Sequence, residues 1–156
     1  MRVVRAGRGF RMVLHAEDVV IEQGAIPFSK PHITLNVRWL DNDDAALSML
    51  IHEEAHWLLV ERWQQGGRQC VYEFMRMYPG LPVGAPEGAE DQMATYVHVI
   101  VNWLEWQGTE EYVGAERARA IIDMKAADHY KAIYKLVIAH REKIGEVLKQ
   151  YGLLNK

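Results

Sequence analysis

His52, Glu53 and His56 interrupt the apolar stretch SMLIHEEAHWLLVERW, residues 48–63, with the spacing H-E-x-x-H. Residues four positions apart lie on one face of a helix, so the imidazoles of His52 and His56 can bind the same metal ion. Glu53 is rotated by about 100° around the helix and can reach a water molecule on that metal. Zinc lowers the pKa of such a water toward ~7, and a glutamate can take its proton and deliver it to a leaving amine. The spacing therefore predicts Zn²⁺ bound by His52 and His56, with Glu53 as the catalytic base.

The same pattern can also arise by accident, because three fixed positions occur together in roughly one chain in fifty of this size. Here the pattern lies inside an expected helix that follows an expected strand, which is the context that the motif requires. Buried histidines without a metal would also need hydrogen-bond partners to offset their desolvation. We therefore favour a metal site over a coincidence on a solvated helix face. Glu54 is expected to point to the opposite side, toward solvent.

A strand, an H-E-x-x-H helix and a second helix that supplies a distant third ligand resemble the zincin metallopeptidases, in particular minimal gluzincin-like domains. The resemblance covers residues 32–107, and HEEAH, residues 52–56, is its specific motif. The longer metzincin form has a third histidine six residues after the second, whereas this chain has Arg62 there. The resemblance implies a zinc-dependent peptidase that acts on a peptide or protein, with its third metal ligand further along the chain.

Candidates for the third ligand all lie in PEGAEDQMATYVHVIVNWLEWQG, residues 86–108. The resemblance favours a carboxylate, and Glu87 and Asp91 have the spacing of a gluzincin ligand followed by a supporting acid. Acids in the first turn of a helix are, however, also favoured by the helix dipole. The carboxylates of this segment are Glu87, Glu90, Asp91 and Glu105.

His98 and Glu105 have no such explanation, because the helix around them is apolar on almost every side. They belong to one polar stripe, which is either the solvated face of this helix or the lining of a site. If the stripe faces the first helix, His98 lies level with His52 and His56, and Glu105 lies about 10 Å further along. One of the two would then bind the metal, and the other would accept a hydrogen bond from a histidine ring. We expect His98 as the third ligand and keep Glu105 as the alternative. The stripe comprises Asp91, Thr95, His98, Asn102 and Glu105.

The segment DHYKAIY, residues 128–134, offers two further catalytic candidates. Zinc peptidases commonly use a histidine or tyrosine from outside the metal helices to hydrogen-bond the oxyanion of the tetrahedral intermediate. His129 and Tyr130 could do this. The alternative is an ordinary helix start, with Asp128 as its cap and aromatic side chains in the core.

Periodicity predicts a single domain, residues 1–156, of the α+β class and mostly helical. A small N-terminal sheet or hairpin is expected, with segments 10–15 and 18–23 flanking a turn and an alternating strand over 32–40. The metal-binding helix and a second long helix follow, and then the C-terminal helices. The expected helices span residues 43–65, 68–78, 87–107, 110–126 and 128–151.

The formal net charge of −3 gives no basic footprint, which argues against nucleic acid or an anionic membrane as a partner. The single Cys70 excludes an internal disulfide and suits a reducing compartment, and no apolar run reaches the ~20 residues of a membrane span. We expect a cytoplasmic zinc-dependent hydrolase, and the sequence does not define its oligomeric state. The alternative is a catalytically inactive, metal-stabilised regulatory or protein-binding module.

Overall fold

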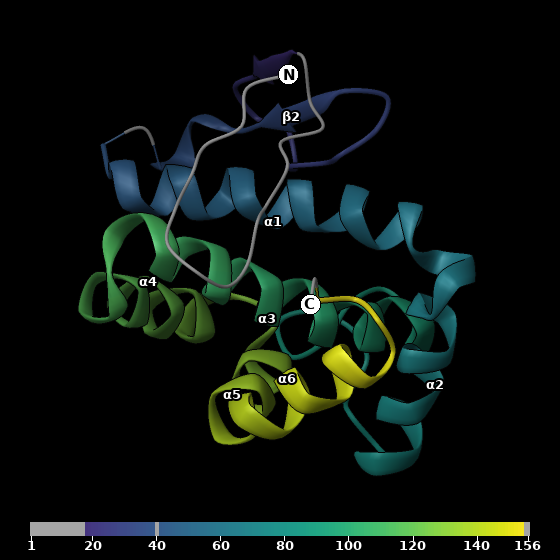
Figure 1. Cartoon of the computed structure of the whole chain (residues 1–156). Coiled ribbons are helices and arrows are strands. Elements are labelled where there is room, and N and C mark those ends of the chain that lie inside the picture. The colour runs from purple at the N-terminus through teal and green to yellow at the C-terminus, as the bar shows by residue number, and fades with distance from the viewer. Residues whose placement is uncertain (1–17, 40, 155–156) are drawn as a thin grey trace.

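Helices dominate the computed structural model, which describes residues 18–39 and 41–154 (Figure 1). Two short strands precede them, so the predicted α+β, mostly helical fold is confirmed. The strands are β1 (Val19–Ile21) and β2 (Ile33–Leu35). The helices are α1 (Asp43–Glu61), α2 (Gly67–Met77), α3 (Gln92–Val113), α4 (Ala115–Asp128), α5 (Lys131–Ala139) and α6 (Arg141–Gln150).

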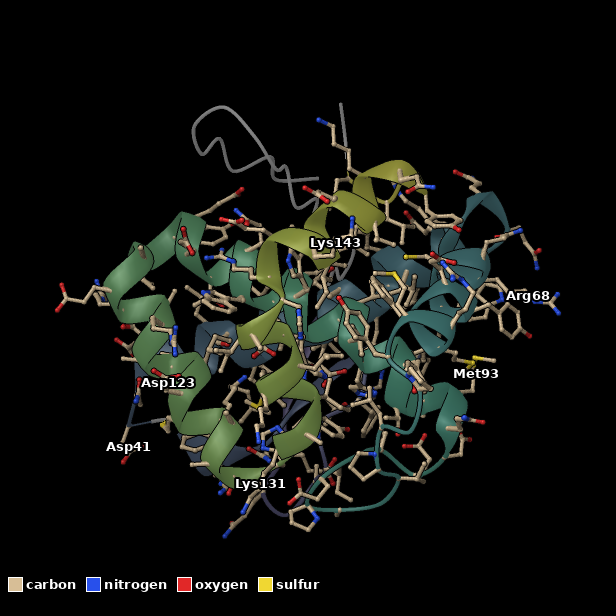
Figure 2. All side chains as sticks on the ribbon, turned by 90° about the horizontal axis from the view of Figure 1, so that it is seen from below. Asp41, Arg68, Met93, Asp123, Lys131 and Lys143 are labelled. Carbon is tan, nitrogen blue, oxygen red and sulfur yellow. The ribbon has the colours of Figure 1, made fainter. Side chains whose placement is uncertain are left out.

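α3 is the central helix, as its apolar sequence predicted. It contacts α1, α2, α4, α5 and α6, and most of its side chains are buried. The two strands lie on one side of α1, and the other helices lie on its opposite side (Figure 1). Charged side chains such as Asp123 of α4 and Lys143 of α6 lie on the outer surface of the bundle (Figure 2). Within the described residues, no helix is both long and apolar enough to cross a membrane.

The sheet is parallel, with Val20 of β1 opposite Thr34 of β2. On its other side, Thr34 exchanges two backbone hydrogen bonds of 2.8 and 3.1 Å with Phe28. β1 lies in the predicted segment 18–23, but its described partner is β2. The other half of the predicted hairpin, residues 10–15, lies outside the described residues.

The predicted alternation of residues 32–40 is wrong. β2 ends at Leu35, its three residues are all buried, and Val37–Trp39 form a short 3₁₀ helix, η1. β2 has backbone partners on both sides, and Ile33 and Leu35 pack with Met49 of α1. All three residues of β2 are buried, so both of its faces are covered, and such a strand does not alternate between buried and exposed residues.

α1 begins as predicted, because the side chain of Asn42 accepts a hydrogen bond of 3.1 Å from the backbone N–H of Ala45. It ends at Glu61, four residues before the predicted end, and Trp63–Gln65 form a second 3₁₀ helix, η2. Gly66 then reverses the chain at φ 146, where a side chain would also collide with the carbonyl of Tyr151.

Both predicted ends of the second long helix are wrong. The helix begins at Gln92, because Asp91 is its N-cap and accepts a hydrogen bond of 2.7 Å from the backbone N–H of Ala94. It continues through Gly108, which is buried, and ends before Gly114 at φ 85. Packing on every side outweighs the cost of one glycine inside a helix, which is about 1 kcal/mol.

The predicted last helix, residues 128–151, is two helices that meet at His140. Asp128 is not the N-cap of α5, because it is the last residue of α4. His129 and Tyr130 form the junction, and Tyr130 has the left-handed conformation, φ 50 and ψ 37. This conformation is uncommon for a residue with a side chain, and here it directs the Tyr130 ring toward α1 and α3.

Candidate metal centre

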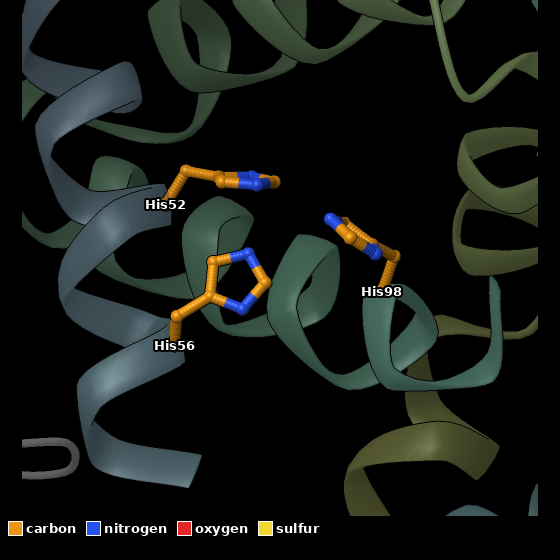
Figure 3. Close-up of side chains that lie close together, drawn as sticks. All are labelled: His52, His56 and His98. Atoms are coloured by element: carbon orange, nitrogen blue, oxygen red, sulfur yellow. The ribbon is translucent and has the colours of Figure 1, made fainter. Parts of the chain in front are cut away.

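Three histidine side chains from two helices converge between α1 and α3 (Figure 3). His52 and His56 lie one turn apart on α1, and His98 reaches toward them from α3. One ring nitrogen of each lies within 4.8 Å of those of the other two. The ring centroids are 5.1 Å apart for His52 and His56, 5.5 Å for His52 and His98, and 4.9 Å for His56 and His98. These nitrogens can therefore face a single ion.

Hydrogen bonds fix the ring orientation of two of the histidines. His52 Nδ1 lies 3.1 Å from Glu105 Oε2, and His98 Nδ1 lies 2.8 Å from the carbonyl oxygen of Ala94. An ionised carboxylate and a carbonyl oxygen only accept hydrogen bonds, so each Nδ1 carries the proton. In a neutral ring with this proton on Nδ1, Nε2 keeps a free lone pair. This tautomer, with an acceptor behind the ring, is the usual state of a histidine that binds a metal.

His56 and His98 are also neutral at pH 7. Burial, with repulsion between the neighbouring rings, lowers the pKa of His56 to about 2 and that of His98 to about 3. A protonated imidazole cannot bind a metal, so the low pKa values keep the lone pairs available. A donor set of three imidazoles suits zinc.

Glu105 is fully buried, and its carboxylate accepts four hydrogen bonds from three other helices. Besides His52 of α1, the donors are Ser48 of α1 at 2.6 Å, Tyr134 of α5 at 2.7 Å and the Lys125 ammonium of α4. Burial alone would raise the pKa of Glu105, but Lys125 and His52 outweigh it, and the pKa lies well below its ordinary value. Glu105 is therefore ionised and holds the His52 ring in place.

Glu53 lies beside the cluster, one residue after His52, and is 5% exposed. Burial raises the pKa of its carboxyl group, and the charge of Glu105 adds to this against the opposing effect of His52. A carboxylate with a raised pKa accepts a proton more readily than an exposed one, which is the property of a general base.

A pocket of about 300 Å³ opens next to these groups, and we call it the Glu53 pocket. It is bordered by the loop before β2, by η1 and by the α4–α5 junction. Its lining includes His52, Glu53, Arg38, Lys125, His129 and Tyr130.

Tyr130 stacks against the histidine cluster. Its ring centroid is 4.3 Å from that of His98 and 6.3 Å from that of His52, whose plane it parallels within 5°. Burial raises the pKa of Tyr130 to about 12, so its hydroxyl stays protonated and can donate a hydrogen bond.

His129 faces the same pocket and is anchored on its other side. Its Nδ1 lies 2.8 Å from Asp128 Oδ2, and Asp128 also accepts two hydrogen bonds, of 2.6 and 2.8 Å, from the Arg38 guanidinium. Burial lowers the pKa of His129 despite Asp128. The neutral ring donates from Nδ1 to the carboxylate, which leaves Nε2 as an acceptor.

The remaining candidate ligands lie elsewhere. Glu87 and Glu90 are exposed in the segment before α3, and Asp91 caps that helix. Glu87 and Glu90 are thus not first-turn acids of the helix, contrary to the prediction. The expectation that Glu54 is exposed is also wrong, since Glu54 is 1% exposed.

The polar stripe of α3 is not a solvated face. Thr95, His98, Asn102 and Glu105 are all buried, and only its first member, Asp91, is exposed. His98 and Glu105 both turn toward α1, where they contact different sides of the His52 ring.

Sequence reasoning missed two partners of Glu105. Lys125 lies in a helix rich in charged residues and resembles a surface lysine, although its side chain is 4% exposed. Ser48 precedes His52 by four residues and so shares its helix face, which was an available signal. Tyr134 was expected only as an aromatic residue of the core.

The chain was compared with protein families, with curated proteins and with solved structures. No family model, no curated protein and no solved structure matches this chain.

Proposed function

We propose that this chain is a zinc-dependent hydrolase of the metallopeptidase class, acting on a peptide or protein. The observation that carries the proposal is the convergence of His52, His56 and His98, with ring nitrogens within 4.8 Å of one another, beside the buried carboxylate of Glu53. Three protein ligands and an open position are typical of catalytic zinc sites, whereas structural sites have four protein ligands.

The donor chemistry fits zinc. Neutral imidazoles are its common nitrogen ligands, and Glu105 would orient His52 from behind, as carboxylates do for zinc-bound histidines. Zinc in this position would lower the pKa of a bound water toward ~7 and polarise the carbonyl group of the substrate.

Glu53 would act as the proton carrier. Its carboxylate takes a proton from the attacking water and delivers it to the leaving amine. The burial that raises its pKa supports the first step, because the carboxylate then takes the proton from the water more readily.

Tyr130 and His129 would have different roles. The Tyr130 hydroxyl is protonated and can donate a hydrogen bond to the carbonyl oxygen as negative charge develops there. The neutral His129 ring donates from Nδ1 to Asp128, so its Nε2 accepts hydrogen bonds and suits an N–H group of the substrate. We therefore assign oxyanion stabilisation to Tyr130.

Metal content tests the site directly. Protein purified without added metal should contain about one zinc per chain, and His52→Ala should lose it. His32 is exposed and lies outside the cluster, so His32→Ala is the matched control and should retain the metal. A metal-free wild-type protein would overturn the proposal.

Glu53→Gln tests the hydrolysis. It should retain zinc and lose cleavage of a peptide library by at least about 10²-fold, because it keeps the shape of the side chain but cannot take a proton. Full cleavage by Glu53→Gln would contradict its role as base. Zinc without any hydrolysis in the wild type would support the metal-stabilised binding module instead.

We also propose a cytoplasmic location. Its support is the single Cys70, which is fully buried and has its pKa raised to about 12 by burial. Such a thiol is an inert core residue that a reducing compartment suits.

A further inference from the structure

A second pocket, of about 430 Å³, lies at the other end of the histidine cluster, and we call it the Val60 pocket. It is formed by the C-terminal part of α1, by η2 and by α3. Its described lining contains no lysine, arginine, aspartate or glutamate. The lining residues are His56, Leu59, Val60, Trp63, Gln64 and Val97.

The two pockets follow one face of α1. Met49 and Glu53 line the Glu53 pocket, and His56 and Val60 line the Val60 pocket. The spacing of these four residues is 4-3-4, which places them in a row along the helix. The histidine cluster lies between the two pockets, since His52 borders the first and His56 the second.

The pockets differ in their chemistry. The Glu53 pocket carries Arg38, Lys125 and Asp128, whereas Leu59, Val60, Trp63 and Val97 give the other pocket an apolar wall. Val60 is 49% exposed although it lies on α1 beside the fully buried core, so its apolar surface is available to a ligand. Burial of apolar groups against such a surface is the main source of affinity in a pocket of this size.

We infer that the Val60 pocket binds a large apolar side chain of the substrate, aliphatic or aromatic, next to the bond cleaved at the histidine cluster. This inference rests on the proposed function. An extended peptide that passes the cluster along α1 places one side chain in the Val60 pocket and the residues beyond the cleaved bond in the Glu53 pocket. Leu59, Val60, Trp63 and Val97 would thus determine specificity.

The inference can be tested with a series of straight-chain hydroxamates that runs from acetohydroxamate to octanohydroxamate. The hydroxamate group binds zinc, and the chain probes the neighbouring surface. Titration calorimetry on the zinc-loaded protein should give an affinity that rises about fourfold for each added methylene until the pocket is filled.

Val60→Arg should abolish this rise, because it replaces part of the apolar wall with a charged side chain, and an alkyl chain packed there would desolvate that charge without a partner. It should leave zinc content and acetohydroxamate affinity unchanged. Val83→Arg is the matched control, since Val83 is also 49% exposed but does not line either pocket. It should keep the full rise.

The two proposals fail in different ways. If acetohydroxamate binds as tightly as octanohydroxamate, the inference is overturned while the metal site stands. The same holds if the affinity of Val60→Arg still rises fully with chain length. Protein without zinc would overturn the proposed function.

For a protein without zinc, a second measurement tests the Val60 pocket. The indole N–H resonance of Trp63, assigned by its loss in Trp63→Phe, reports on this pocket without metal. Its shift should respond to 1-hexanol in the wild type and in Val83→Arg but not in Val60→Arg, and no response in the wild type would overturn the inference.

Discussion

His52 and Glu105 are joined by a hydrogen bond of 3.1 Å from Nδ1 to Oε2, between the two longest helices of the described chain. Because Glu105 is ionised and fully buried, this bond fixes both the tautomer and the orientation of the His52 ring. The bond therefore links the packing of the core to the geometry of the proposed metal centre.

Glu105→Gln should weaken zinc binding by about 10- to 100-fold, since the amide loses the negative charge that supports His52. Competition with a chelator measures the zinc affinity, at a temperature at which circular dichroism shows that the variant is folded. Ser48→Ala is the control, because Ser48 donates to the other oxygen of the same carboxylate. It should lower the free energy of unfolding by about 1 kcal/mol and leave zinc affinity within twofold. Equal losses of zinc affinity in both variants would contradict the role of the His52 bond.

His98→Ala should abolish stable zinc binding, because two histidines from one helix leave the ion with too few protein ligands. His140→Ala provides the comparison, because His140 lies at the α5–α6 boundary and its ring contacts that of Tyr78, 5.1 Å away between centroids. Elemental analysis measures the zinc content per chain of both variants. One zinc per chain in His98→Ala would exclude His98 as the third ligand.

Tyr130→Phe should lower kcat for peptide cleavage by about 10²- to 10³-fold, while KM and zinc content change little. The phenyl ring keeps the contacts with the His98 and His52 rings, and only the hydroxyl donor is lost. Steady-state kinetics with a fluorogenic peptide separate the two constants. Unchanged kcat in Tyr130→Phe, with reduced kcat in His129→Ala, would move the oxyanion role to His129.

Asp128→Asn should lower the free energy of unfolding by about 1 kcal/mol at pH 7, a value reduced for the partial exposure of this ion pair. The hydrogen bonds from Arg38, followed by that from His129, lower the pKa of Asp128 to about 2, against 3.8 for an unperturbed group. The folded state thus favours the ionised carboxylate. This stabilisation is complete above pH ~5, decreases below the ordinary pKa of 3.8, and is lost as the pH falls through about 2.

Denaturant unfolding at several pH values should consequently show the wild type and Asp128→Asn converging below pH 3. Asp123→Asn is the control, since Asp123 pairs with Arg119 on the exposed face of α4. It should cost less than about 0.5 kcal/mol at any pH. A difference between wild type and Asp128→Asn that is as large at pH 2 as at pH 7 would show that charge does not cause it.

Helical periodicity and the H-E-x-x-H spacing were sufficient to predict the helical architecture and the positions of His52, Glu53 and His56 on one helix. The arrangement of His98 and Glu105 followed from a second argument. Polar residues on a helix that is apolar all round need partners, and a rise of 1.5 Å per residue keeps both from reaching one ion.

Long-range packing could not be predicted in this way. The sequence near Lys125 resembles an ordinary exposed helix, and only the tertiary fold brings its ammonium to Glu105. Gly108 looked like a helix end, but burial on all sides carries α3 past it to Gly114. Likewise, the predicted alternation of residues 32–40 placed Thr34 on the polar face of the strand, whereas its side chain is fully buried.

The four donors to Glu105 have a consequence for biosynthesis. Ribosomes make the chain from its N-terminus, so His52, His56 and His98 emerge before Lys125 and Tyr134. A nascent chain that ends after α3 carries all three proposed ligands, yet the carboxylate that orients His52 still lacks its cation and its phenol. Truncation within α4 or α5 would therefore weaken the proposed metal centre without removing any of its proposed ligands. The order of synthesis delays the complete hydrogen bonding of Glu105 until Lys125 and Tyr134 have been made.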